Sequence, residues 1–442
     1  MKKLLSVVLA LLMLAVMLPV TAMAADGYVT VSGINGFENR QFASFAEAYA
    51  AIKPTVETLG LGQETPANAE AFDAVFTDVT DGKATLTYTI SGNVTYDESS
   101  CENLLTMGRK SSHYLTNERH LINFKFVGAT GRDSDTLTVN SDMTLPYEWW
   151  GEKTTTSISF ENLTITGSAP NGLRPTQDYF EGINFKVNNC KLEGIKIYNC
   201  SNVGGSYTIT NNIFDGTNAP KDAYAIHLQG HETAPLTINI SNNTISGYDR
   251  GINIDQKTAA ATISNNNISV KDTGRSCIQL TRLASTKVEN NTMNLTGGNA
   301  ITLHEELLKC AKPEITVSGN TINGTGYLIY DDATANNKSF TNDNLTLTIT
   351  EDNTVAKTVD ITQGVKGSTK YGMSEIVKTT VENNVVPGGS TGGTIVIITP
   401  TEDTPKTEPE KNPTTGANDV VAAAVALMAV SALGMAVLTR KK

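Results

Sequence analysis

One short phrase returns seven times between about residue 157 and residue 342, and it constrains the fold more than any other feature of the chain. Each copy places one or more asparagines between residues that alternate apolar and polar, as in the segment ISNNTI at residues 240–245. One asparagine of each copy can be aligned, at spacings of 27, 23, 31, 23, 25 and 29 residues: Asn162, Asn189, Asn212, Asn243, Asn266, Asn291 and Asn320. A period of this length predicts a solenoid, in which each repeat packs only against its neighbours.

The alternation on both sides of the asparagine predicts short β-strands separated by a tight corner. The spacings of three and four residues that an amphipathic helix would need do not appear in the repeats. A second alternating strand follows in most repeats, for example at residues 251–255 and 277–281. About two dozen residues with three short strands make one coil of a parallel β-helix, so the sequence predicts an all-β, right-handed parallel β-helix solenoid.

The aligned asparagines have a physical role at the corner of each coil. Asparagine tolerates the left-handed backbone conformation, and its side-chain amide can donate to and accept from the asparagines of the coils above and below. This pattern resembles the asparagine ladder of pectate-lyase-like β-helices, over about residues 80–365. The resemblance implies the fold and leaves the activity open, because many enzymes and non-enzymes share this fold.

The N-terminal part of the chain predicts an exported protein whose solenoid begins with a cap. Residues 1–24 combine two lysines, an apolar run and a small-residue cleavage site, as in a secretory signal peptide. Residues 25–156 are predicted to hold the cap and early irregular coils. Apolar residues at helical spacing over residues 42–52, with Pro54 just beyond, predict a short helix that covers the open end of the solenoid.

The C-terminal part of the chain predicts attachment to the cell surface. The regular repeats are assigned to residues 157–367, and the Gly/Ser/Thr-rich and Pro-rich residues 368–411 predict an extended spacer. Residues 412–442 then combine a short polar motif, an apolar run over residues 420–438 and a basic end. This tail resembles the cell-wall sorting signal of Gram-positive surface proteins, with the motif Asn412, Pro413, Thr414, Thr415 and Gly416.

The resemblance implies that a sortase cuts between Thr415 and Gly416 and joins Thr415 to peptidoglycan. The family pattern begins with leucine where this chain has Asn412, which leaves the sortase class undetermined. An ordinary C-terminal transmembrane helix is the alternative interpretation, since nineteen residues are just enough to cross a bilayer. Both interpretations place residues 25–411 outside the cell.

The net charge limits the classes of partner, and the cysteine content limits the kinds of site that the chain can form. The net charge of −11 argues against nucleic acid and against anionic membrane surfaces. Five cysteines are an odd number without metal-type spacing, so free thiols in the core are expected. The adjacent Trp149 and Trp150 allow two interpretations, stacking on sugar rings or packing over a loop.

The second strand of each coil predicts where a ligand could lie. In the resembling folds this strand lines an exposed cleft, and its apolar residues are expected to face inward. The alternation then places polar residues outward, flanked by Arg250, Arg275 and Arg282. The predicted ligand-binding face comprises His227, Asp255, His304 and Asp331, where the place of Asp331 depends on aligning Leu328 with Ile301.

The sequence carries only a weak signal for catalysis. The motif order of a polygalacturonase is not present, and the carboxylates near Asp255 are too few for a calcium site. Glu305 and Asp332, expected one coil apart, form the one carboxylate pair at a glycosidase-like spacing. No metal or other cofactor is predicted, although calcium is not excluded.

The expected function is that of a monomeric, wall-anchored surface protein that binds glycan or another host or microbial surface polymer along its solenoid. A polysaccharide lyase or glycoside hydrolase on the same fold is the alternative, and a structural surface protein is the second alternative. The expected partners are sortase, peptidoglycan and the polymer, without nucleic acid.

Overall fold

The computed structural model describes residues 27–57, 69–80, 83–97, 121–143, 156–175, 183–200, 204–230, 235–271, 275–350 and 352–360. The chain divides into two compact units, residues 1–395 and 396–442, and every described residue lies in the first. The predicted signal peptide, the two tryptophans, the spacer over residues 368–411 and the sorting signal lie outside the described residues. Within the described ranges, no helix has the length and apolar character needed to cross a membrane.

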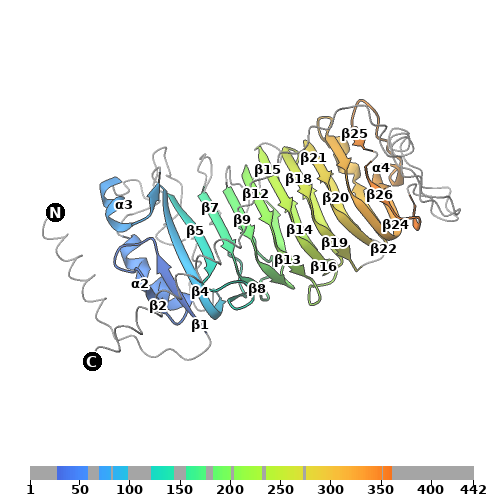
Figure 1. Ribbon diagram of the computed structural model, residues 1–442. Helices are drawn as coiled ribbons and strands as arrows, with labels where there is room; N and C mark the ends of the chain where they lie inside the picture. The colour runs from blue at the N-terminus through green and yellow to red at the C-terminus, as the bar shows by residue number, and fades with distance from the viewer. Residues whose placement is uncertain are drawn as a thin grey trace, which may run out of the picture. The chain divides into compact units, whose positions relative to one another are not determined.

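The prediction of a right-handed parallel β-helix is confirmed, with strands stacked in sequence order along the solenoid (Figure 1). Each regular coil contributes a strand to each of three faces. The first face contains β5 (Leu121–Gly128), β7 (Thr156–Glu161), β9 (Ile183–Asn188), β12 (Gly205–Thr210), β15 (Leu236–Ser241), β18 (Ala259–Ser264), β21 (Ser285–Glu289), β23 (Glu314–Ser318) and β25 (Thr346–Ile349).

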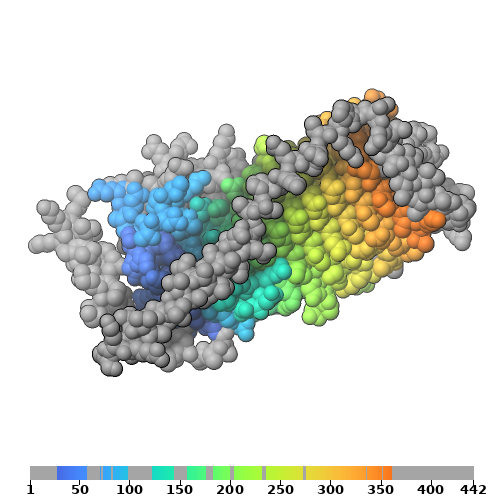
Figure 2. Space-filling view, in the orientation of Figure 1, coloured from blue at the N-terminus to red at the C-terminus, as the bar shows by residue number. Residues whose placement is uncertain are grey.

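The second face contains β6 (Thr136–Val139), β8 (Thr164–Thr166), β10 (Lys191–Glu193), β13 (Ile213–Asp215), β16 (Thr244–Tyr248), β19 (Asn267–Val270), the first parts of β22 (Thr292–Leu303) and β24 (Thr321–Asp331), and β26 (Thr354–Val355). The third face contains β11 (Ile197–Cys200), β14 (Tyr224–Gln229), β17 (Arg250–Asp255), β20 (Ser276–Arg282), the last parts of β22 and β24, and β27 (Val359–Asp360). Figure 2 shows residues of successive coils as adjacent bands in sequence order.

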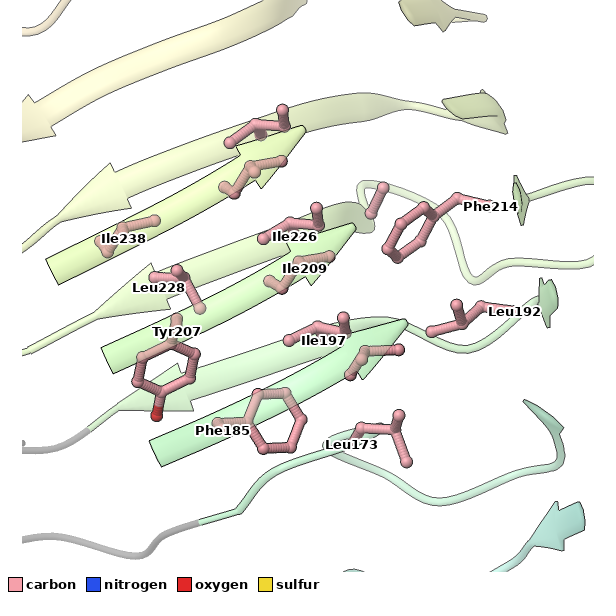
Figure 3. Packing of buried hydrophobic residues seen from close by; sticks show 14 of the residues in the cluster. Leu173, Phe185, Leu192, Ile197, Tyr207, Ile209, Phe214, Ile226, Leu228 and Ile238 are labelled. Carbon is pink, nitrogen blue, oxygen red and sulfur yellow. The ribbon is translucent and has the colours of Figure 1, made fainter. Parts of the chain in front are cut away.

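The core is a set of apolar columns that run along the inside of the solenoid. Parallel pairing places Ile209 beside Ile240 and Ile240 beside Ile263, and all three are fully buried. Figure 3 shows side chains from different faces, among them Phe185, Tyr207 and Leu228, pointing into the shared interior. Because strand residues alternate between the two sides of the sheet, the polar residues between these apolar ones face outward.

The N-terminal end is covered by α2 (Phe45–Glu57), which confirms the predicted capping helix. The Ser44 hydroxyl accepts a hydrogen bond from the Glu47 N–H at 3.2 Å, and the Glu47 carboxylate accepts one from the Ala43 N–H at 3.0 Å. The first bond satisfies an amide that the first helical turn leaves open, and the second holds the residue that precedes the cap. The helix extends beyond the predicted end and contains Pro54, because Val56 continues its buried stripe.

The remaining elements at this end differ from the regular coils. Strands β1 (Gly27–Ser32) and β3 (Val79–Thr80) run antiparallel to β4 (Lys83–Tyr96), and β2 (Arg40–Phe42) runs antiparallel to β1. The short helix α3 (Ala69–Val75) precedes β3. Strand β4 then pairs in parallel with β5, so the change from antiparallel to parallel pairing occurs across this one long strand.

A stack of aromatic rings joins the cap to the first coils. Phe45 of α2 contacts Tyr88, with the ring centroids 5.7 Å apart. The rings of Tyr88 and Phe126 are stacked at 5.3 Å, and those of Phe126 and Phe160 at 5.0 Å. The contacts continue through Phe185 to Tyr207. The cap is therefore part of the same core as the solenoid, which stabilises the end of the fold.

The corner residues form two neighbouring columns. One column has the left-handed backbone and the other makes the side-chain hydrogen bonds, whereas the sequence analysis assigned both roles to a single column. In the first column the backbone is left-handed, with φ between 54° and 62°, at Asn162, Asn189, Asn211, Asn242, Asn265, Asn290 and Gly319. In the second column the side chains point inward and are hydrogen-bonded from coil to coil, at Asn212, Asn243, Asn266, Asn291, Asn320 and Asn353. We call the second column the ladder.

The alignment of Asn162 and Asn189 with the ladder is corrected by one residue. Strand register places Leu163 and Cys190 at the ladder position of their coils, and Asn162 and Asn189 in the left-handed column. At the corner itself each of these coils has a single asparagine, since Asn188 is the last residue of β9. That asparagine lies at the left-handed position, because a non-glycine residue other than Asn or Asp is strained there. The Asn189 amide still donates to Asn162 Oδ1 at 2.7 Å.

The ladder is expected to contribute strongly to stability. Asn243 Oδ1 accepts from the Asn212 N–H and side-chain amide, and Asn243 Nδ2 donates to the Ile209 carbonyl at 2.8 Å and to Asn266 Oδ1 at 2.9 Å. Asn243→Ala would leave several of these buried groups without partners, so we expect the free energy of unfolding to fall by about 2–4 kcal/mol in urea denaturation. The control Asn242→Gly, at the exposed left-handed position, should cost less than about 1 kcal/mol. Equal effects of the two substitutions would contradict this role of the ladder.

Candidate functional site

The third face carries an outward row of polar and aromatic side chains, one from each coil. Strand register aligns six residues in this row: Tyr198, His227, Asn253, Gln279, Thr302 and Tyr330. The row follows from alternation, because each member lies between two buried residues that face inward, such as Ile278 and Leu280.

A groove of about 360 Å³ lies over the C-terminal part of this row. Ten residues line it: Tyr224, Arg250, Arg275, Ser276, Gln279, Asn299, Thr302, His304, Tyr330 and Asp332. They come from five successive coils, on or directly beside strands β14, β17, β20, β22 and β24, and on α4 (Asp332–Ala335). The groove therefore runs along the stacking direction and is lined by hydroxyl, amide, guanidinium and aromatic groups.

Hydrogen bonds connect the floor of the groove across the coils. Arg250 Nη1 donates to the Tyr224 hydroxyl at 3.1 Å, and that hydroxyl donates to Gln279 Oε1 at 3.1 Å. Gln279 Nε2 donates to the Thr281 hydroxyl at 3.0 Å, which in turn donates to Asn253 Oδ1 at 2.8 Å. Such a chain fixes the orientation of its polar groups before any ligand is bound.

Two arginines converge on one carboxylate at the side of the groove. Asp222 Oδ1 lies 3.0 Å from Arg275 Nη2 and 3.4 Å from Arg250 Nη2. The Arg250 guanidinium also lies over the Tyr224 ring, 5.0 Å from its centroid. Two cationic groups therefore share one carboxylate oxygen here.

His227 lies outside the groove, at the adjoining N-terminal part of the row. Its ring contacts those of Tyr224 and Tyr198, with centroids 4.8 Å and 5.3 Å apart. Burial lowers the pKa of His227 to about 4; Asp255 opposes this shift, and Lys196 and Arg250 reinforce it. His227 is therefore neutral at physiological pH and presents a packed ring, whereas the prediction treated it as an exposed ligand-binding group.

The placement of Asp331 on the outward face is wrong. Ile301 aligns with Ile329, where the prediction assumed Leu328, because the pairing of β22 and β24 shifts by one residue between Thr296 and Asn299. A shift of one residue moves a side chain to the other side of a sheet. Asp331 is accordingly fully buried, and its Oδ1 accepts a hydrogen bond from the Thr334 N–H at 3.2 Å at the start of α4.

Asp255 is largely buried, with 9% of its surface exposed, and its carboxylate is paired with Arg282 Nε. The strand shifts register between Ile254 and Asp255, so that Asp255 aligns with Arg282 rather than Thr281. Asp255 therefore stabilises the end of the third face and is not among the residues that line the groove.

His304 and the predicted catalytic pair lie together at the C-terminal end of the groove. His304 caps the 3₁₀ helix η2 (Glu305–Lys309), where its Nδ1 accepts from the Glu306 N–H at 3.2 Å, and its Nε2 lies 3.5 Å from Asp332 Oδ2. The Glu305 N–H donates to the same Asp332 oxygen at 3.5 Å. The Glu305 carboxylate is paired with Lys338 Nζ at 2.7 Å, and Asp332 lines the groove whereas Glu305 does not.

The sequence prediction did not include Tyr224 and Tyr330 and assigned Arg250 and Arg275 only a flanking position. The alternation of the strands could have identified the tyrosines. Each tyrosine lies next to a buried residue, at a position where the neighbouring coil carries a polar side chain. The convergence of the arginines depends on the loop that carries Asp222, which lies outside the repeat pattern.

Comparison with known protein families finds a match to part of the chain. Residues 161–358 match a family model described as periplasmic copper-binding protein (NosD). Comparisons with curated proteins and with solved structures gave no match. The matched region contains the whole ladder from Asn212 to Asn353, so the similarity covers the coils that carry the groove.

The described residues do not fit a copper site. Copper prefers thiolate, imidazole and thioether ligands. Cys190 and Cys277 are fully buried in the core, and burial raises the pKa of both thiols to about 12. His227 packs between tyrosine rings, and both ring nitrogens of His304 face protein partners. In the part of the chain that the structure describes, no three His, Cys, Asp or Glu side chains are grouped to hold a metal ion.

His227 should make stability depend on pH. Its pKa of about 4 in the folded protein is below the ordinary value of 6.5, so the unfolded chain takes up a proton first as the pH falls. The contribution of neutral His227 is therefore complete above pH 6.5 and is lost as the pH falls toward 4. We expect a loss of about 3 kcal/mol in unfolding free energy over this range that is absent from His227→Gln. Parallel pH profiles for wild type and variant would contradict the assignment.

Proposed function

We propose that this chain is an exported protein that binds a glycan in the groove on the third face. The observation that supports the proposal is the lining itself, where Tyr224 and Tyr330 border amides, hydroxyls and two guanidinium groups. Sugar rings offer apolar faces that pack on aromatic rings, and hydroxyls that bond to amide and guanidinium groups. A groove of this composition suits a polar ligand better than an apolar one.

The stacking of coils favours a polymer over a single sugar. Successive coils repeat hydrogen-bonding groups about every 4.8 Å, which is close to the length of a sugar ring. Gln279, Thr302 and Tyr330 come from three successive coils and line the same groove. Many weak contacts can therefore add along one chain, while the hydrogen bonds of the floor keep the groups in place.

Export and wall attachment are part of the proposal. They are supported by the signal peptide and the sorting motif that the sequence predicts, and export also agrees with the periplasmic location of the matched family. Attachment to peptidoglycan through Thr415 would place the groove where extracellular polymers reach it.

Cleavage of the bound polymer is the second candidate function. The observation that favours it is Asp332, which lines the groove next to His304 and has Glu305 as its neighbour. A lyase or hydrolase would release shortened products, whereas a binding protein would retain its ligand unchanged, and a structural protein would do neither.

The glycan proposal predicts retention of at least one polymer from a broad polysaccharide panel. Gln279→Ala and Tyr330→Ala each remove a contact from the groove, so we expect each to lower affinity roughly tenfold. Thr262→Ala, on the outward side of the first face, is the control and should bind as wild type. Unchanged retention by both groove variants, once both are shown to be folded, would exclude the groove as the site.

The localisation proposal predicts that muramidase releases the protein from cells and that detergent does not. Covalent attachment through Thr415 explains this outcome, because muramidase cuts the polymer to which the chain would be joined. Mass spectrometry of the released protein should find no residues beyond Thr415. Detergent release of a product that still contains residues 440–442 would support a membrane anchor instead.

A further inference from the structure

We propose that Ser276, Asn299 and Thr302 determine the specificity of the groove by accepting the hydroxymethyl group of a hexose unit. We call these three residues the floor cluster. The inference rests on the proposed glycan function and adds the class of sugar. It predicts that the groove prefers polymers of hexoses to polymers of pentoses, which lack the hydroxymethyl group.

The floor cluster is brought together by two neighbouring coils. Strand register places Ser276 of β20 beside Asn299 of β22, and Thr302 follows on the same strand. All three line the groove, yet only 8%, 9% and 5% of the surfaces of Ser276, Asn299 and Thr302 are exposed. Tyr224 and Gln279 line the same groove and are more exposed. The cluster therefore lies at the bottom of the groove, below its more exposed lining.

The hydrogen bonds inside the cluster leave one hydroxyl proton over. Ser276 Oγ and Thr302 Oγ1 lie 2.5 Å apart, so one of the two hydroxyl protons lies between them. The Asn299 side-chain N–H donates to Thr302 Oγ1 at 3.5 Å and so takes up neither proton. Each hydroxyl carries one proton, so the second proton has no acceptor among the described residues, whichever of the two side chains carries it.

The side-chain oxygen of Asn299 is the matching acceptor. Its amide nitrogen bonds to Thr302, but no donor of the described residues bonds to Asn299 Oδ1. Largely buried polar groups are costly when they lack a hydrogen-bond partner. The floor of the groove thus presents one donor and one acceptor to a group that can pair with both.

A single ligand hydroxyl can pair with both groups. It donates its own proton to Asn299 Oδ1 and accepts the remaining proton of the cluster through its oxygen. Two partners at a tetrahedral angle around that oxygen are separated by about 4.6 Å, given ordinary O–H···O distances. Neighbouring coils are about 4.8 Å apart, so Ser276 and Asn299 belong to coils at the spacing that one bridging hydroxyl requires.

The depth of the cluster selects the kind of hydroxyl. A secondary hydroxyl oxygen is attached directly to the sugar ring, whereas a hydroxymethyl oxygen extends one carbon further. Tyr224 and Gln279 hold a ring above the cluster, so the longer group is the one that reaches the floor. A pentose unit fills the groove and leaves both groups of the cluster unpaired, which is the basis of the selection.

The test compares cellohexaose with xylohexaose, two β-1,4-linked oligomers that share a backbone and differ in the hydroxymethyl group. Both are extended chains, as a groove along the stacking direction requires. Calorimetry on the full chain should give at least about tenfold tighter binding of cellohexaose. Equal affinities, or tighter binding of xylohexaose, would overturn the inference.

Asn299→Ala is the decisive variant because it removes the acceptor. We expect the affinity for cellohexaose to fall roughly tenfold and that for xylohexaose to change little, so that the ratio of the two approaches one. A purely structural role would lower both affinities together and leave the ratio unchanged. Asn294→Ala, on the same strand but outside the groove lining, is the matched control and should keep the wild-type ratio.

The double variant Ser276→Ala/Thr302→Val tests the donor and replaces Asn299→Ala if that variant does not fold. It removes both hydroxyls and should also bring the ratio toward one. Either single substitution should keep most of the preference, because the remaining hydroxyl still offers one proton. A wild-type ratio in the folded double variant or in folded Asn299→Ala would contradict the role of the cluster.

Failure of the inference can be distinguished from failure of the proposed function. If wild type binds both hexaoses alike and Gln279→Ala weakens both, the groove binds glycan without selecting this group, and only the inference fails. If wild type binds neither hexaose, the inference fails, but groove-dependent retention of another polymer leaves the proposed function standing. If no polymer of the panel is bound, both fail.

Discussion

Parallel strand pairing, coil upon coil, is the constraint on which the rest of this structure depends. It fixes each residue directly above its counterpart in the preceding coil, about 4.8 Å away. An apolar residue at one inward position is therefore matched by an apolar residue at the next, and the core becomes a set of columns such as Ile209, Ile240 and Ile263. The ladder uses the same spacing, because the side-chain Nδ2 of one asparagine reaches the side-chain Oδ1 of the asparagine in the next coil.

The same constraint explains which parts of the fold could be predicted from the sequence. Alternation and repeat length were sufficient for the fold, since both are properties of every coil. The register was less certain, because it can shift by one residue within a strand without changing the overall pattern. The shift between β22 and β24 moved Asp331 from the predicted face into the interior. Asn162 and Asn189 were misaligned for a related reason, since Leu163 and Cys190 occupy the ladder position in their coils and the one asparagine at the corner could be assigned to either of two adjacent positions.

The sequence analysis placed the candidate site on the third face, where the groove lies, but most of the residues it named do not line the groove. His304 lines the groove as part of the predicted face, and Asp332 lines it too, although it was predicted as part of a catalytic pair. His227 and Asp255 lie on the third face but are held by aromatic rings and by Arg282. The convergence of Arg250, Arg275 and Asp222 brings together residues 53 positions apart in sequence, through a loop that no repeat rule describes.

The similarity to a copper-binding family can be understood in the same terms. The features that recur along residues 161–358 are inward and corner positions, which every coil needs in order to stack. Function depends on outward positions, and stacking places few limits on them because they contact solvent or ligand. Two chains can therefore share the coil pattern and differ in the groups they present. Here the outward groups of the groove are mainly tyrosine, arginine, amide and hydroxyl side chains, which suit a polar polymer better than a copper ion.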